Sequence, residues 1–213
     1  MDLGMGWLVF MGLQVMLFIS ARGSEAHSVH SHKWKIDYLE WSPDCVKETA
    51  IAINGQYPGP AIKAQVGDII VVEVENLLPT ENVVIHWHGI HQIGTPWNDG
   101  TASVSQCPIF AGETYNYTFV VDMPGTYFYH GHYGLQRTAG LYGWLIVDAA
   151  EEEPFSYDGE LRILLNDQWH QSVYEQSYGL SSRPMHWVGE PQVFQLHLIL
   201  SYAFDILFSA PLC

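Results

Sequence analysis

Apolar and polar side chains alternate along several short runs of this chain. Residues 69–76 place valine or isoleucine at every second position, and residues 115–121 do the same with tyrosine, phenylalanine and valine. An alternation of period two gives a strand one buried and one exposed face. Similar runs at 33–41, 49–53 and 143–148 are separated by Gly- and Pro-rich turns, which together predict an all-β sandwich. A short helix is expected at 134–139.

The first 26 residues predict a secretory signal peptide. Leu3 to Ile19 is almost entirely apolar, and Ala21-Arg22-Gly23 or Ser24-Glu25-Ala26 offers a small-x-small cleavage site. A transmembrane anchor is the alternative, but a span needs about 20 apolar residues. We therefore expect a secreted, extracellular protein with no membrane contact after signal removal. The tripeptide Asn116-Tyr117-Thr118 is then an N-glycosylation acceptor, which predicts a glycoprotein.

The remaining chain divides into three predicted parts. Residues 27–150 form a first domain, and residues 151–192 contain an acidic linker and the opening strand of a second domain near 161–170. Residues 193–213 form an apolar tail, in which Gln195, His197 and Asp205 argue against a membrane anchor. We expect this tail to be an aberrant terminus that truncates the protein.

Two histidine pairs carry the strongest chemical signal. They stand in His86-Trp87-His88-Gly89 and in His130-Gly131-His132, each preceded by an apolar or aromatic run. Residues i and i+2 of a strand share a face, so two adjacent strands could surround one point with four imidazoles. Imidazole suits Cu, Zn, Fe and Ni, whereas Mg and Ca prefer oxygen. Two exposed strand faces that happen to carry histidine are the alternative, and a metal site explains the duplication better.

The composition of the chain limits the classes of molecule that it is expected to bind. Apolar residues make up 48% of the chain, enough for a packed core, and 8 basic residues face 23 acidic ones for a formal charge of −15. This charge argues against nucleic acids and anionic membranes, which select for Lys and Arg. The three cysteines Cys45, Cys107 and Cys213 are an odd number for a secreted chain.

The sequence around the histidine pairs resembles the first domain of plant blue multicopper oxidases, and within them the L-ascorbate oxidase family. The resemblance runs from about Lys33 to Gln192. Laccases typically have Asp-Gly-Pro and His-Ala-His where this chain has Asp99-Gly100-Thr101 and His130-Gly131-His132. The matching motifs are His86–Ile90, Gly94–Trp97, Asp99–Ser103, Ser105–Ile109, Gly125–His132 and Gly140–Gly143.

This resemblance implies a cupredoxin-like Greek-key sandwich and copper as the cofactor. In the family, a blue type 1 copper takes electrons from ascorbate, and a trinuclear cluster reduces O2 to water. By motif, His86 matches a type 2 ligand, while His88, His130 and His132 match type 3 ligands. The other four cluster histidines and the type 1 ligands come from a C-terminal domain of the family. The resemblance also implies a homodimer.

Other residues take weaker expectations from the same resemblance. Asp99 matches a residue used in proton delivery, although an Asp-Gly turn explains it equally well. Trp187 matches a wall of the ascorbate site, or is an ordinary interface aromatic. Cysteines matching Cys45 and Cys107 bond to later segments in the family, so both are expected to lack a partner here. A bridge between Cys45 and Cys107, or one to Cys213, is the alternative, because the Cα separations do not follow from the sequence.

The remaining histidines carry weaker expectations. A disordered start of the mature chain is expected to contain His27, His30 and His32, with adventitious metal binding as the alternative. His91 is expected to be a surface or polar-core residue, and His170, His186 and His197 have no paired histidine neighbour.

We therefore expect a truncated L-ascorbate oxidase-like chain that keeps half of the trinuclear copper site and is inactive alone. A secreted copper-binding or interaction module without catalysis is the first alternative, and a laccase-like fragment is the second. A chain that does not fold stably is the third, because lost domains would expose apolar surface.

Overall fold

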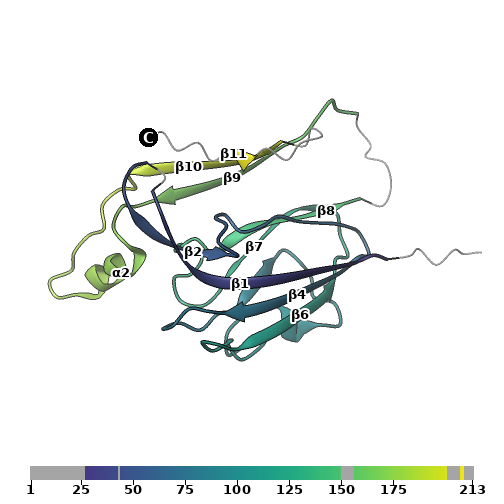
Figure 1. Ribbon diagram of the computed structural model, residues 1–213, viewed down its shortest axis with the longest axis horizontal. Helices are drawn as coiled ribbons and strands as arrows, with labels where there is room; N and C mark the ends of the chain where they lie inside the picture. The colour runs from purple at the N-terminus through teal and green to yellow at the C-terminus, as the bar shows by residue number, and fades with distance from the viewer. Residues whose placement is uncertain (1–26, 43, 150–155, 201–206, 209–213) are drawn as a thin grey trace, which may run out of the picture.

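The computed structural model describes residues 27–42, 44–149, 156–200 and 207–208 (Figure 1). The predicted signal peptide and the acidic run at 151–154 lie outside the described residues. Within those described, no helix combines the length and apolar character needed to cross a membrane.

Strands dominate the described chain, as the alternation predicts. Each predicted strand is found, and β1 begins four residues earlier than expected. The elements are β1 (Val29–Trp41), β2 (Glu48–Ile53), β3 (Ile62–Gln65), β4 (Ile69–Asn76), β5 (Ile85–His88), the 3-10 helix η1 (Pro96–Asn98), β6 (Thr114–Val120), β7 (Gly125–Gly131), β8 (Tyr142–Asp148), β9 (Leu161–Gln168), α2 (Val173–Ser181), β10 (Val193–Leu200) and β11 (Leu207–Phe208).

The first eight strands form a sandwich of two four-stranded sheets. One sheet has the order β2-β1-β4-β6 and the other β3-β8-β7-β5, so the chain crosses repeatedly between them, as expected for a Greek-key sandwich. Along β4 the even-numbered residues are fully buried and the odd-numbered ones partly exposed. The core between the sheets is centred on three packed aromatic rings, Trp34, Trp87 and Tyr129.

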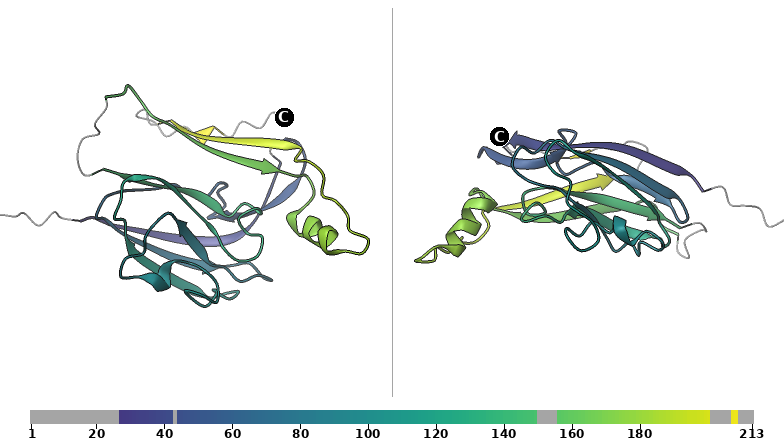
Figure 2. Two further views of the ribbon diagram at one scale, coloured as in Figure 1. Left: turned by 180° about the vertical axis from the view of Figure 1, so that it is seen from behind. Right: turned by 90° about the horizontal axis from the view of Figure 1, so that it is seen from below.

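A third layer covers the outer side of the second sheet. It has the order β11-β10-β9, and Figures 1 and 2 show it beside β8. Residues of β1 and β2 line one pocket together with residues of β9, so the outer sheet also meets an end of the first sheet. Leu164 of β9 packs against Trp144 and Ile146 of β8. The Tyr57 hydroxyl donates to Oε1 of Gln195 in β10 over 2.9 Å, which ties this outer sheet to the sandwich.

Two local expectations are wrong. Residues 134–139 form turns rather than a helix, and Leu141 N–H returns to the Gln136 carbonyl at 3.0 Å. His30 and His32 do not belong to a disordered start, because β1 pairs in parallel with β4 from Val29 onward. His30 Nε2 lies 2.8 Å from Asp68 Oδ2, a contact that alternation alone could not reveal.

Candidate metal centre

Strands β5 and β7 bring the two histidine pairs together. They pair antiparallel with His86 opposite His130 and His88 opposite Phe128. The intervening Trp87 and Tyr129 point the other way and are fully buried in the core. The side-chain period of two thus turns all four histidines to one face, while the core anchors the strands beneath them.

The imidazole rings of this face lie close to one another. His86, His88 and His130 each offer a ring nitrogen, and these three nitrogens lie within 4.8 Å of one another. The His132 ring centroid lies 5.5 Å from that of His86 and 5.8 Å from that of His130. Three of the four predicted ligands therefore converge on one point, and the His132 ring lies beside them.

A backbone carbonyl fixes the tautomer of His86. Its Nδ1 lies 2.7 Å from the Asp99 carbonyl oxygen, which only accepts hydrogen bonds, so Nδ1 carries the proton. Gly100 makes this approach feasible: its φ is +80°, and a Cβ there would lie 1.7 Å from the Ile85 carbonyl oxygen. The lone pair of His86 is consequently on Nε2, the usual arrangement of a metal-binding histidine.

His130 is held in the same way and is more deeply buried. Its Nδ1 lies 3.0 Å from the Gly131 carbonyl oxygen, which leaves the lone pair on Nε2. That Nε2 is buried and has no hydrogen-bond partner among the described residues, which is costly unless something else binds it. Burial lowers the pKa of His130 to about 4, so its imidazole stays neutral and able to bind a metal in mildly acidic solution.

These features fit a transition metal better than an ordinary polar cluster. The face offers neutral imidazoles with the tautomer of two of them fixed, and a buried nitrogen that lacks a partner. Imidazole is a good ligand for copper, which binds nitrogen ligands more tightly than other divalent first-row ions. His86, His88, His130 and His132 are the residues that would hold it.

Of the two weaker site predictions, Asp99 lies beside the histidine face and Trp187 lies in another segment of the chain. The Asp99 carboxylate lies 3.6 Å from His86 Nδ1 and is 38% exposed, while its backbone makes the shorter contact. Asp99 thus occupies both the turn position and the neighbourhood of the site. Trp187 lies between α2 and β10 and is 71% exposed. Its predicted role beside ascorbate stays a prediction.

The cysteine expectation is half wrong. Cys45 is disulfide-bonded, so it does not lack a partner. Cys107 is free and exposed, so these two cysteines are not bridged to each other. Spacing along the chain could not decide this, because a disulfide depends on Cα separations in the folded state.

Sequence reasoning missed a second group of ligand-type side chains. Asp44, Glu48 and His170 each offer an atom, and these atoms lie within 4.8 Å of one another. His170 has no paired histidine neighbour in the sequence, and its Nε2 lies 2.6 Å from Asp44 Oδ2. Burial, followed by the nearby charge of Asp44, raises the pKa of Glu48 to about 7. No local spacing signalled this group, since 126 positions separate His170 from Asp44.

Known proteins resemble this chain in sequence and in structure. Residues 35–152 match a family model described as multicopper oxidase. An L-ascorbate oxidase of Cucurbita maxima is 56% identical over 192 residues, 89% of this chain and 33% of that protein. An L-ascorbate oxidase of Cucumis sativus is 58% identical over 190 residues, 87% of this chain and 32% of that protein. The chain spans about a third of the length of these relatives.

Solved structures that resemble this chain point to the same family as the sequence comparison. The crystal structure of Fet3p, described as a multicopper oxidase that functions in iron import, superimposes with a TM-score of 0.73 at 30% identity, covering 79% of this chain and 32% of that one. A laccase from Botrytis aclada gives a TM-score of 0.69 at 33% identity, covering 80% and 31%. The expected cupredoxin-like sandwich is therefore confirmed.

Proposed function

Because this chain belongs to the multicopper oxidase family, we propose that its four-histidine face supplies copper ligands to an L-ascorbate oxidase. The electron donor would be ascorbate and the acceptor O2, as the 53–58% identity to plant L-ascorbate oxidases favours. The identity to a rice laccase is lower, at 42% over 154 residues, which argues against the laccase alternative.

The observation that carries the proposal is the buried, partnerless Nε2 of His130. A nitrogen in that state gains most from a metal, because no side chain or backbone group of the described residues compensates its burial. We assign His86 to type 2 copper and His88, His130 and His132 to type 3 copper. Copper, when bound, would supply the electron transfer and O2 reduction.

The surrounding residues would act on the ligands. The Asp99 carbonyl holds His86 with Nε2 free, and the Gly131 carbonyl does the same for His130. Phe128 stacks on His88 and on His130, with ring centroids at 4.8 and 5.0 Å, and so restricts both rings. We further propose that the Asp99 carboxylate delivers protons and that Trp187 borders the ascorbate site.

Secretion, glycosylation and a homodimer belong to the same proposal. Asn116 and Thr118 are exposed on β6, the edge strand of the first sheet, where a glycan would meet no neighbouring strand. An N-glycan at this position requires passage through the secretory pathway. This placement supports an extracellular protein.

The experiment is a count of bound copper and an assay of ascorbate-dependent O2 uptake on the same sample of the 213-residue chain. We expect bound copper without uptake, because these residues supply four histidines and no His-Cys-His sequence for a blue copper site. The matched control is His186→Ala, which should keep the copper, whereas His86→Ala should lose it. Absence of copper binding would contradict the proposal, and uptake would require ligands from a second chain.

A further inference from the structure

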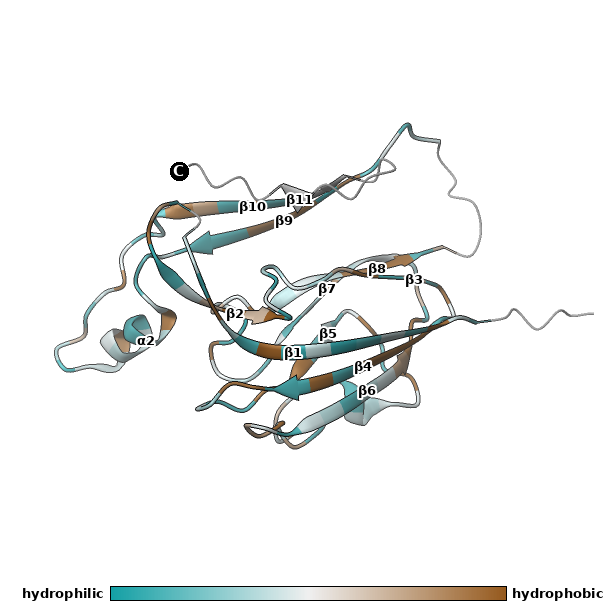
Figure 3. Ribbon diagram, viewed as in Figure 1, coloured by the Kyte–Doolittle hydropathy of each residue, from teal (hydrophilic) through white to brown (hydrophobic). Residues whose placement is uncertain are grey.

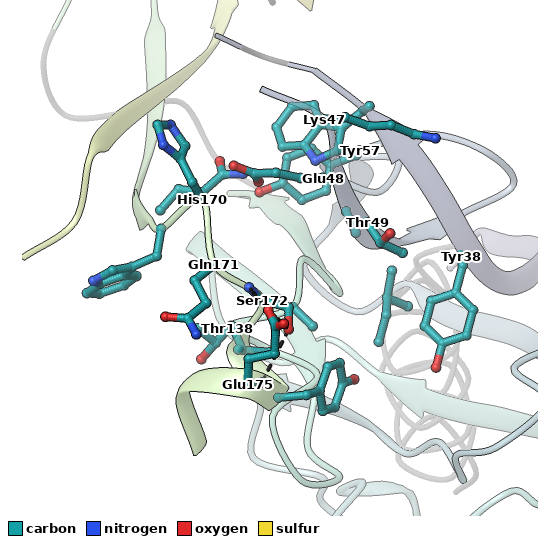
Figure 4. A pocket seen from close by; sticks show the side chains of 18 of the residues that line it. Tyr38, Lys47, Glu48, Thr49, Tyr57, Thr138, His170, Gln171, Ser172 and Glu175 are labelled. Carbon is teal, nitrogen blue, oxygen red and sulfur yellow. Dashed lines mark hydrogen bonds between the residues drawn. The ribbon is translucent and has the colours of Figure 1, made fainter. Parts of the chain in front are cut away.

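A second ligand group lies where the sandwich meets the outer sheet. Asp44 lies in the connection between β1 and β2, Glu48 begins β2, and His170 follows β9. Figure 4 shows Glu48 and His170 at neighbouring positions on the wall of one pocket. The group therefore joins three chain segments from two layers.

The side chains of this group present one nitrogen and two carboxylates to a common point. Their ligand atoms lie within 4.8 Å of one another, and His170 Nε2 to Asp44 Oδ2 is 2.6 Å. Oε1 of Glu48 is buried and has no hydrogen-bond partner in the described structure. A buried carboxylate oxygen without a donor is costly, so the site lacks a positive group that Glu48 could bind.

Within the described residues, His170 is the chargeable neighbour of Glu48, and its Nε2 pairs with Asp44 instead. Lys47 is next in sequence to Glu48, but its Nζ pairs with Glu40 at 2.6 Å, and no arginine or lysine makes an ion pair with Asp44 or Glu48. The protein as a whole carries a formal charge of −15, which favours uptake of a cation.

We propose that Asp44, Glu48 and His170 form a zinc site that clips the outer sheet to the sandwich. One imidazole and two carboxylates with room for water is a known Zn²⁺ ligand set, whereas Ca²⁺ and Mg²⁺ favour oxygen alone. The pocket that Glu48 and His170 line has a volume of about 560 Å³, so water can complete the coordination. Zn²⁺ takes the place of the proton between His170 Nε2 and Asp44 Oδ2, and that proton is released to solvent.

This site is independent of the proposed copper centre. It uses none of the four histidines of β5 and β7, and its ligands come from other segments: the connection between β1 and β2, the start of β2, and the residues after β9. Its expected consequence is mechanical: zinc links residues 126 positions apart and stabilises the packing of β9 on β8.

The test is a titration of the metal-free 213-residue chain with Zn²⁺, followed by calorimetry and by thermal unfolding. The four-histidine face is intact in every variant and can take zinc in each of them. A difference between variants in the number of zinc ions bound therefore reports on the second site alone. We expect wild type and the control His186→Ala, an exposed histidine of the same segment, to bind one equivalent more than His170→Ala and Glu48→Gln. The zinc-induced rise in melting temperature should be smaller in the latter two.

Glu48→Gln is nearly isosteric and keeps His170 beside Asp44, so it separates loss of a ligand from loss of the fold. Equal zinc stoichiometry in all four proteins, with equal shifts in melting temperature, would show that the group is an ion pair only and would overturn the proposal.

Discussion

The sandwich and the outer sheet use the same alternation in opposite ways. In β4, the residues Ile70, Val72 and Val74 point into the core and are fully buried. In β9, the apolar Leu161, Ile163 and Leu165 point outward and are more than half exposed. Figure 3 shows both strands with brown, apolar residues mainly in their first half and teal, polar residues toward the arrowhead.

Strand β10 continues this contrast. Its apolar Phe194 and Leu196 are exposed, and its polar Gln195 and His197 are buried against the sandwich. The comparison teaches that period two identifies a strand but does not say which layer lies against it. The sandwich buries its own apolar face, whereas the inner face of the outer sheet depends on a few contacts with Tyr57, Trp144 and Ile146.

The largest expected effect separates the two layers by stability. Trp87→Ala removes a fully buried side chain from beneath the four histidines and should lower the free energy of unfolding by about 3–5 kcal/mol. Leu165→Ala, 60% exposed on the outer sheet, should change it by less than about 0.5 kcal/mol. Urea unfolding measures both, and equal losses would erase the contrast.

Acid should weaken both layers. Burial lowers the pKa of His130 in the sandwich and of His197 in β10 to about 4, so the unfolded chain binds protons first as pH falls. Their contribution is fully present above about pH 6.5 and is lost between pH 6.5 and 4. Glu48, with its pKa raised to about 7, acts oppositely, because its contribution is lost as pH rises from 4.5 through 7.

We expect a net loss of about 2–3 kcal/mol between pH 7 and pH 4.5 in the metal-free chain. Urea unfolding at the two pH values measures it, and His197→Gln should reduce the loss by removing the contribution of the outer sheet. A free energy of unfolding that stays level or rises on acidification would contradict the assignment of these neutral, buried histidines.

A glycine next to the metal face should matter more than the carboxylate beside it. Gly100→Ala would drive a Cβ into the Ile85 carbonyl and move the Asp99 carbonyl off His86, so copper affinity should fall by roughly 10–100-fold. Asp99→Ala keeps the carbonyl and should change affinity by less than about 3-fold. Competitive Cu²⁺ titration compares them, and a larger loss in Asp99→Ala would assign the ligand contact to the carboxylate instead.

The smallest expected effect concerns the contact between the layers. Tyr57→Phe removes the hydroxyl that bonds Tyr142 at 2.7 Å and Gln195 at 2.9 Å, at a cost of about 1 kcal/mol. Hydrogen exchange should quicken in residues 193–200 and stay unchanged in β4. Tyr178→Phe, which alters an exposed tyrosine of α2, is the control. Equal acceleration in both strands would mean that the layers open together.

The sequence predicts the sandwich and its shared histidine face well because both depend on short-range periodicity. His86 with His88, and His130 with His132, need only the strand period to share a face. The unpredicted features depend on long-range packing. The contact of His170 with Asp44, the pairing of His30 with Asp68 and the orientation of β9 each join segments that no local pattern relates.

The most direct test of the account is electron paramagnetic resonance of the chain with one equivalent of Cu²⁺, for wild type, His130→Ala and His91→Ala. His91 is an exposed histidine close to the face in sequence, paired with Asp122 at 2.7 Å. We predict nitrogen hyperfine structure from several imidazoles in wild type and His91→Ala, and the loss of a nitrogen ligand with at least about 10-fold weaker binding in His130→Ala. Identical spectra and affinities in all three proteins would contradict a copper site built on β5 and β7.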